Sequence, residues 1–195
     1  MSKTVAGLVL AAGAGTRIGQ PKASILLNGE RFVDRAIRLL RESGCDSVYV
    51  VLGAWIEEVK NCQIIVNKNW EQGISTSLKI GLETLIEQNK KNKQKSEAEI
   101  THVLITLVDL PGITTDALKK VKDHPADIVV ATYQGVRGHP VKISSQYWQE
   151  LANSVSGDQG AKAFLKARTN VAEVALEDQA GITDVDTQAD LKRHL

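Results

Sequence analysis

An unbroken apolar run over residues 5–10, followed at once by closely spaced glycines, is the feature that most constrains the fold. A short apolar run of this kind predicts a buried strand in a sheet that is covered on both faces. The glycines allow a tight turn after the strand and a close approach of backbone N–H groups to an anion. Arg17 and Lys22 add positive charge just beyond the turn. The segment therefore predicts a phosphate-binding loop at the end of the first strand of an α/β fold.

Two common nucleotide-binding loops do not fit this glycine spacing. A P-loop requires a glycine directly before Lys-Ser or Lys-Thr, and the chain has no such sequence. The dinucleotide fingerprint G-x-G-x-x-G is one residue shorter than the spacing found here. It also requires an acidic residue after the second strand, whereas the predicted strand 47–52 runs into Gly53. The structural alternative is a glycine-rich turn with no ligand, which would not explain the positions of Arg17 and Lys22.

Strand-like apolar runs alternate with amphipathic segments along the chain. Predicted strands cover 5–10, 48–52, 63–66, 103–108, 128–132, 141–143 and 171–176, and predicted helices cover 31–42, 75–87, 115–122, 145–153, 161–167 and 187–194. This alternation favours a doubly wound, mainly parallel sheet in three α/β/α layers, with ligands beyond the carboxyl ends of the strands. The glycines of 133–140 predict a local antiparallel excursion, and the charged segment 88–99 predicts a solvated loop. No repeat or boundary is evident, so we expect one domain over 1–195.

Composition argues against several classes of partner. The chain has 195 residues and a formal net charge of +1, so no overall field favours nucleic acid or a membrane surface. No apolar run reaches membrane-spanning length, and no signal-peptide core follows Met1. Cys45 and Cys62 lack metal-binding spacing and are interpreted as reduced packing residues. These features predict a cytoplasmic protein whose partner is a small anion.

The segment 10–22 reads L-A-A-G-A-G-T-R-I-G-Q-P-K. It resembles the signature L-A-A-G-x-G-x-R-[MI]-G-x-x-K of the nucleotidyltransferases that include molybdenum cofactor cytidylyltransferases and guanylyltransferases. The resemblance implies the Rossmann-like nucleotidyltransferase fold, in which this loop wraps the triphosphate of CTP or GTP. The implied nucleotide-binding residues of the loop are Leu10, Ala11, Ala12, Gly13, Gly15 and Lys22. Arg17 and Lys22 are then the candidate catalytic cations that stabilise pyrophosphate as it leaves.

Two aspartates are the candidate ligands of a magnesium ion. Asp109 follows the predicted strand 103–108 and precedes Leu-Pro-Gly, in a segment that resembles the family motif [AG]-D-[ML]-P. Mg²⁺ prefers oxygen ligands and commonly takes one or two carboxylates together with substrate phosphates. Asp186 lies in D-V-D-T-Q-A-D-L, which resembles the motif D-[IV]-D-T-x-x-D-L. The alternatives are a turn-opening role for Asp109 and a helix N-cap for Asp186.

Residues 67–78 resemble the family segment N-x-x-[WY]-x-x-G-[MI]-x-[ST]-S-L, which contacts the nucleotide. By that resemblance Asn67, Gly73 and Ser77 are candidate nucleotide-binding residues, and Trp70 is predicted to be a packing residue. The start of a helix offers unpaired N–H groups to an anion or a base edge. Ser75 has the alternative role of capping that helix.

Two further segments resemble acceptor-side motifs of the same family. His139 lies in Gly-His-Pro-Val, which resembles G-[HN]-P-[VA], and Asp158 lies in a segment that resembles G-D-x-G-A-[RK]. The resemblance implies that His139 and Asp158 contact the acceptor. A structural role for the histidine and a helix cap for Asp158 are the alternatives.

The resemblance implies Mg²⁺-dependent transfer of a nucleoside monophosphate from an NTP to a phosphorylated acceptor, with release of pyrophosphate. The tetrapeptide L-A-A-G favours CTP, since guanylyltransferases commonly show L-A-G-G, and a molybdopterin-type cofactor is the favoured acceptor. Transfer to another phosphorylated metabolite or sugar is one alternative. A nucleotide-binding or redox member of the family without transferase activity is another. The expected partners are the NTP, the acceptor and a molybdoenzyme, with no nucleic acid and no membrane.

Overall fold

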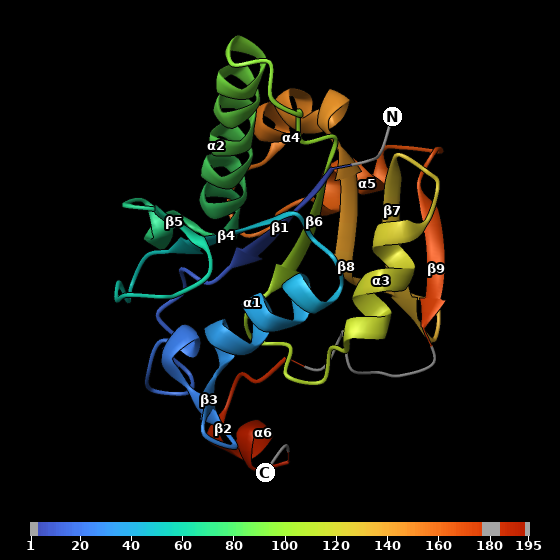
Figure 1. Cartoon of the computed structure of the whole chain (residues 1–195). Helices are drawn as coiled ribbons and strands as arrows, with labels where there is room; N and C mark the ends of the chain where they lie inside the picture. The colour runs from blue at the N-terminus through green and yellow to red at the C-terminus, as the bar shows by residue number, and fades with distance from the viewer. Residues whose placement is uncertain (1–3, 177–183, 194–195) are drawn as a thin grey trace.

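The computed structural model describes residues 4–176 and 184–193, and its centre is a seven-stranded sheet (Figure 1). The sheet has the order β5-β4-β1-β6-β8-β7-β9. The strands are β1 (Val5–Leu10), β4 (Ser47–Leu52), β5 (Gln63–Val66), β6 (His102–Leu107), β7 (Ile128–Tyr133), β8 (Val136–Ser144) and β9 (Ala172–Leu176). Strand β8 is antiparallel to both of its neighbours, and the other neighbouring pairs are parallel. The mainly parallel sheet is confirmed, and the antiparallel excursion is the β7–β8 hairpin.

Helices cover both faces of this sheet, which gives the expected three layers (Figure 1). The helices are α1 (Phe32–Glu42) and α3 (Thr115–Asp123) on one face, and α2 (Ile74–Gln94), α4 (Trp148–Ser154) and α5 (Lys162–Lys166) on the other. A short helix, α6 (Gln188–Lys192), follows near the end of the chain. None of the helices in the described ranges is both long and apolar enough to cross a bilayer.

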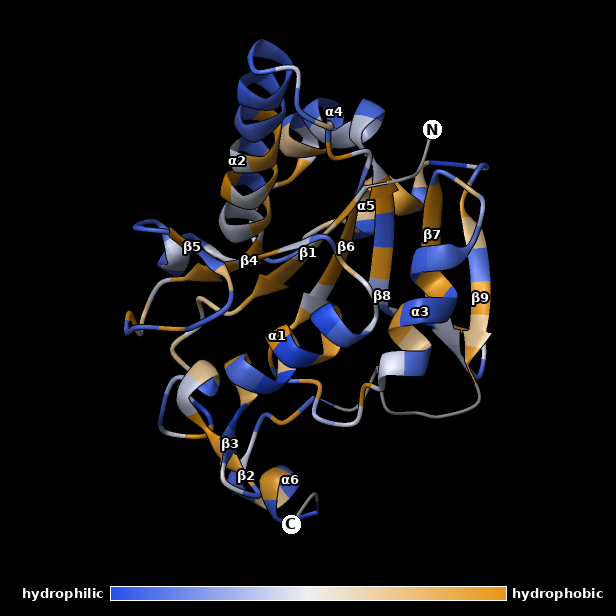
Figure 2. Ribbon diagram, viewed as in Figure 1, coloured by the Kyte–Doolittle hydropathy of each residue, from blue (hydrophilic) through white to orange (hydrophobic). Residues whose placement is uncertain are grey.

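Successive side chains of the strands β1, β4, β6 and β7 contribute to two separate hydrophobic cores. Figure 2 shows that these strands are largely hydrophobic in composition. In β1, Val5 and Val9 pack with the α1 and α3 side, whereas Ala6, Leu8 and Leu10 pack with the α2 side. Burying such a side chain contributes about 1.5–3 kcal/mol each, so both faces need helices to cover them. The continuous apolar runs noted in the sequence are therefore the expected pattern for this sheet.

The segment 88–99 differs from its prediction, because α2 continues through Gln94. The Asn89 amide donates to the carbonyl oxygen of Ile100 and accepts from its N–H group, both at 2.8 Å. The Asn92 amide donates to the carbonyl oxygen of Ala98 at 2.8 Å. These side-chain hydrogen bonds attach the last turns of the helix to the returning chain, so a polar composition did not prevent helix formation here.

A small hairpin of β2 (Leu26–Leu27) and β3 (Glu30–Arg31) was not predicted from the sequence. Its turn residues Asn28 and Gly29 both have positive φ, 52° and 83°. An Asn-Gly pair is the usual sequence of a two-residue hairpin turn, and it could have identified this element.

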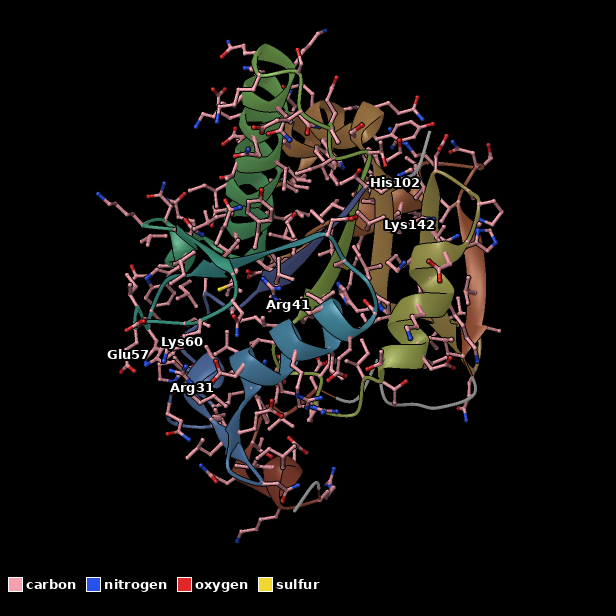
Figure 3. All side chains as sticks on the ribbon, in the orientation of Figure 1. Arg31, Arg41, Glu57, Lys60, His102 and Lys142 are labelled. Atoms are coloured by element: carbon pink, nitrogen blue, oxygen red, sulfur yellow. The ribbon has the colours of Figure 1, made fainter. Side chains whose placement is uncertain are left out.

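The side chain of Lys142 joins β8 to the end of α3 within the fold (Figure 3). The residue is fully buried, and its ammonium group donates to the carbonyl oxygens of Lys122, at 3.1 Å, and of His124. Backbone carbonyls at a helix C-terminus carry partial negative charge, which partly compensates a buried cation. We assign this lysine a structural role.

Candidate functional site

A pocket of about 340 Å³ opens where the carboxyl ends of β1 and β6 meet the start of α2. Its lining includes many of the residues selected from the sequence: Leu10, Ala11, Ala12, Gly13, Gly15, Lys22, Gly73, Ser77, Asp109 and Asp158. Arg17, Asn67, His139 and Asp186 do not line it. The position at the carboxyl edge of the strands is where open α/β sheets bind their ligands.

The loop after β1 turns sharply at Gly15, which has a φ of +62°. A Cβ atom at Gly15 would collide with the backbone carbonyl oxygen of Gln20, so a side chain has no room there. The Gly15 carbonyl accepts from the N–H groups of Ile18, at 3.0 Å, and Gly19, at 2.9 Å. At Gly13, by contrast, the space around a Cβ position is open to 4 Å, which leaves the backbone accessible from the pocket.

The ammonium group of Lys22 lies between two carboxylates that come from distant parts of the chain. Its Nζ is 2.6 Å from Asp109 Oδ2 and 2.5 Å from Asp186 Oδ1. Burial lowers the pKa of Lys22, but the charge and hydrogen bonds of the two aspartates raise it more, so the net direction is upward. The hydrogen bond from Lys22 in turn lowers the pKa of Asp186. Lys22 and Asp186 are therefore charged near neutral pH.

The segment that carries Asp186 is attached to the first loop and to β6. The N–H group of Val185 donates to the Asp109 carbonyl at 3.1 Å, and the Gln188 amide donates to the Ile18 carbonyl at 3.0 Å. Arg17 Nη1 is 2.6 Å from Asp186 Oδ2, while the Arg17 side chain is 74% exposed.

The N-cap of α6 is Thr187, in a capping box with Asp190, so the predicted alternative of Asp186 as the cap is wrong. The Asp186 carboxylate is instead directed to the two cations, Lys22 and Arg17.

Asn67 lies at the end of β5, beneath the pocket rather than in its wall. Its Nδ2 donates to Thr76 Oγ1 at 2.8 Å and to Ser77 Oγ at 2.9 Å, and its Oδ1 accepts from the Asn69 N–H at 2.9 Å. Ser77, to which it is bonded, does line the pocket. Asn67 thus connects the end of a strand to the helix start that lines the pocket.

The loop that carries Asp158 packs directly against the start of α2. Gly73 has a φ of +104°, and a Cβ there would collide with Asp158 Oδ1 and lie 2.6 Å from the Gly157 carbonyl oxygen. The Ser75 N–H donates to that carbonyl at 3.1 Å, and Ser75 Oγ accepts from the Gly160 N–H at 3.2 Å.

Neither helix cap considered for this region is present. Helix α2 begins after Gly73 without a side-chain cap, and α5 begins after Ala161 without one, so Ser75 and Asp158 are not the caps. The two segments instead form one continuous wall of the pocket.

Residues 7–173 match the family model described as the MobA-like NTP transferase domain. The chain belongs to this family. A relative named nicotine blue oxidoreductase, from Paenarthrobacter nicotinovorans, is 32% identical over 98% of this chain and 96% of its own length. A probable molybdenum cofactor guanylyltransferase of Mycobacterium ulcerans is 24% identical over 96% of this chain and 92% of its own. The crystal structure of Rv0371c from Mycobacterium tuberculosis H37Rv superposes with a TM-score of 0.82 at 25% identity, covering 100% of this chain and 99% of that one.

Family membership identifies the chain as a nucleotidyltransferase. His139 lies outside the pocket lining in this site. Its carbonyl accepts from Tyr133 Oη at 2.6 Å. Burial lowers the pKa of the His139 imidazole to about 4, so the ring is neutral at physiological pH.

Some lining residues were not selected as binding residues from the sequence, namely Ala14, Thr16, Trp70, Glu71, Ile74, Leu107 and Val108. Most of them are sequence neighbours of selected residues, which is the signal that could have identified them. Trp70 is half-buried, and its Cβ would lie 2.7 Å from a Cβ placed on Gly53. The ring therefore packs on the turn after β4 while also lining the MobA-like pocket.

Proposed function

We propose that this chain acts as one domain that transfers a nucleoside monophosphate from CTP to a phosphorylated acceptor of molybdopterin type, with Mg²⁺ and release of pyrophosphate. The observation that carries the proposal is the convergence of Asp109 and Asp186 on Lys22 beside the glycine-rich loop. Binding of a nucleotide alone does not call for two carboxylates at the end of a phosphate cradle. Transfer of a nucleotidyl group does, because charge on the phosphates has to be neutralised as bonds change.

The two aspartates are suited to hold a divalent cation. Both carboxylates approach one positively charged atom, Lys22 Nζ, within 2.6 Å, so they already surround a single cationic position. Mg²⁺ is commonly bound by one or two carboxylates, with substrate phosphates completing its shell. We infer that Asp109 and Asp186 hold the ion. When bound, it would supply Lewis-acid stabilisation of the phosphate that is attacked.

The other residues bind and neutralise the nucleotide. The backbone N–H groups around Gly13 and Gly15 hold the phosphates, and Arg17 and Lys22 compensate the charge of the leaving pyrophosphate. An acceptor phosphate is itself anionic, so its attack needs no general base. This agrees with a His139 imidazole that is neutral and outside the pocket lining, and we assign it contact with the acceptor alongside Asp158.

The choice of CTP rests on Ala12, in the tetrapeptide that resembles the cytidylyltransferase form. The mycobacterial relative carries the name of a guanylyltransferase, so GTP is the competing nucleotide. Pyrophosphate release with each NTP, with and without molybdopterin, in Mg²⁺, tests the proposal. Release with CTP that depends on molybdopterin supports it, and a product transferred to a molybdoenzyme would extend it. Release with GTP alone rejects the nucleotide assignment, and no release with any NTP and phosphorylated acceptor rejects the transferase proposal.

An oxidoreductase is the second candidate function, because the relative at 32% identity is named as one. The two cysteines do not supply an evident redox centre in the pocket, since neither Cys45 nor Cys62 lines it. Burial raises the pKa of the Cys45 thiol to about 11, which keeps it protonated and unreactive. Oxidation of NADH or NADPH with a quinonoid dye as acceptor tests this candidate. Turnover in that assay, without pyrophosphate release in the first, would favour it.

A further inference from the structure

The amide of Asn67 has a fixed orientation beneath the pocket. The residue is 3% exposed, and Oδ1 faces the backbone N–H of Asn69 at 2.9 Å. A backbone N–H can only donate, so the amide atom that faces it has to be the oxygen. The nitrogen Nδ2 is therefore the atom that faces Thr76 Oγ1 and Ser77 Oγ.

This orientation determines the hydrogen-bonding role of Ser77. An amide nitrogen only donates, so Ser77 Oγ accepts from Asn67 at 2.9 Å and keeps its own proton for another acceptor. Within residues 4–176 and 184–193, the Ser77 hydroxyl donates to no protein group. The residue is 4% exposed and lines the pocket. A buried hydroxyl proton without an acceptor is unfavourable, so a ligand atom that accepts it gains affinity.

The surroundings of Ser77 indicate which part of a nucleotide this atom belongs to. Ser77 lies in the pocket wall formed by the start of α2 and the short helix before it, together with Trp70 and Ile74. Among the described lining residues the one cation is Lys22, which belongs to the glycine-rich loop. The loop wall suits phosphates. The wall of Ser77 has no cation among its described residues; it combines the apolar surfaces of Trp70 and Ile74 with the carboxylates of Glu71 and Asp158, and it suits a flat base better than a phosphate.

We propose that Asn67 is a positioning residue that fixes Ser77 as a hydrogen-bond donor to a carbonyl oxygen of the nucleotide base. Cytosine, guanine and uracil have such an oxygen, and adenine does not. The pocket then discriminates against ATP through a residue that does not touch the ligand. This inference rests on the proposed nucleotide site. It goes beyond that proposal by naming the base atom that is recognised, a carbonyl oxygen, and by naming Asn67 as the residue that makes Ser77 a donor.

The test measures binding of the four NTPs in Mg²⁺ by calorimetry for the wild type and for variants of the whole chain. Asn67→Asp keeps an oxygen for the Asn69 N–H but presents a second oxygen to Ser77, which turns the hydroxyl proton away from the ligand. Ser77→Ala removes the donor directly. For each variant we expect the CTP and GTP affinities to fall about 3- to 10-fold with ATP affinity unchanged. The double variant should lose no more than either single variant.

Thr76→Val is the matched control, because it removes the other hydroxyl bonded to Asn67 and leaves Ser77 intact. We expect it to keep the wild-type ratio of CTP to ATP affinity. If Asn67→Asp does not fold, Asn67→Ser replaces it. The shorter side chain no longer donates to the Ser77 hydroxyl, so the ratio of CTP to ATP affinity should also fall.

Four results would overturn the inference. The first two are an equal loss of affinity for all four NTPs, and an unchanged ratio of CTP to ATP affinity in the Asn67 and Ser77 variants. The others are the same loss of affinity in the Thr76 control, and no NTP binding by the wild type. Selective binding that depends on Asn67, but without pyrophosphate release in any acceptor assay, would reject the proposed transferase function and leave this inference standing.

Discussion

Lys22 Nζ and Asp109 Oδ2 lie 2.6 Å apart although 87 positions separate the two residues in the chain. Asp186, 164 positions from Lys22, completes the arrangement from the other side. A lysine placed between two carboxylates is held in one orientation before any nucleotide is bound. The side chains of this cluster are therefore ordered by contacts within the chain itself.

The first prediction concerns Lys22→Ala. We expect the rate of pyrophosphate release to fall by about 10²- to 10³-fold, because the variant lacks the half-buried cation that is proposed to compensate charge on the leaving group. Circular dichroism should show an unchanged fold. Lys90→Ala is the control, since Lys90 is an exposed residue whose ion pair with Glu87 lies far along α2 from its start. Near-normal activity of Lys22→Ala would remove this residue from the mechanism.

The second prediction concerns the binding of a divalent cation. Asp109→Asn and Asp186→Asn should each weaken Mn²⁺ binding to the protein–nucleotide complex, measured by electron paramagnetic resonance of the free ion. Even groups that only orient a metal ligand contribute about 10- to 100-fold in affinity, so the loss of a ligand should cost at least as much. Asp123→Asn, in an exposed ion pair with Lys122, serves as the control. An affinity that is unaltered in Asp186→Asn would reject that residue as a ligand.

The third prediction concerns the contact between Gly73 and the Asp158 loop. Gly73→Ala forces a side chain into a φ of +104° and into contact with Asp158, so we expect a loss of about 1–3 kcal/mol in the free energy of unfolding. Gly135→Ala separates the two causes, because Gly135 has a φ of +81° but open space around its Cβ position. Urea denaturation of both variants measures the difference. Equal losses would show that the contact with the loop contributes nothing.

The fourth prediction concerns pH. The pKa of His139 is lowered to about 4 in the folded chain, against about 6.5 for an ordinary histidine. Between these values the unfolded chain binds a proton that the folded chain does not, so the contribution to stability is complete above about pH 6.5 and is lost as the pH falls toward 4. His139→Asn should flatten the dependence of unfolding free energy on pH in this window. A slope identical to that of the wild type would contradict the burial of the imidazole.

The strands and the glycine-rich loop could be predicted because their signals are local. The run 5–10 became β1 with those bounds, and the run 63–66 became β5. The extent of α2 could not be predicted, since the hydrogen bonds of Asn89 and Asn92 that hold its last turns reach residues that follow the helix. The hairpin around Asn28 was missed because its strands are too short to show a period, although its turn has a recognisable sequence.

The candidate site likewise contains residues whose position could be predicted from the sequence and residues for which it could not. Asp109 and the loop residues could be selected from their positions after strands, and all of them except Arg17 line the pocket. The competition between roles at Asp186 could not be decided from sequence, because a good capping sequence and a ligand motif overlap there; the structure assigns the cap to Thr187. The sequence did not indicate that the Asn67 amide is hydrogen-bonded to Thr76, to Ser77 and to the Asn69 N–H group. The roles of Asp186 and Asn67 depend on the direction in which each side chain points, and the spacing of residues in a sequence motif does not specify that direction.

The attachment of residues 185–188 to the first loop has a consequence for the synthesis of the protein. The loop after β1 emerges from the ribosome early, but Asp186 follows it by more than 160 residues of translation. A nascent chain or a truncated product without that segment carries the glycine-rich loop and Lys22 with one of its two carboxylates missing. A chain that stops before residue 186 therefore has only Asp109 to compensate the charge of Lys22, and the second carboxylate arrives with a segment that is translated much later.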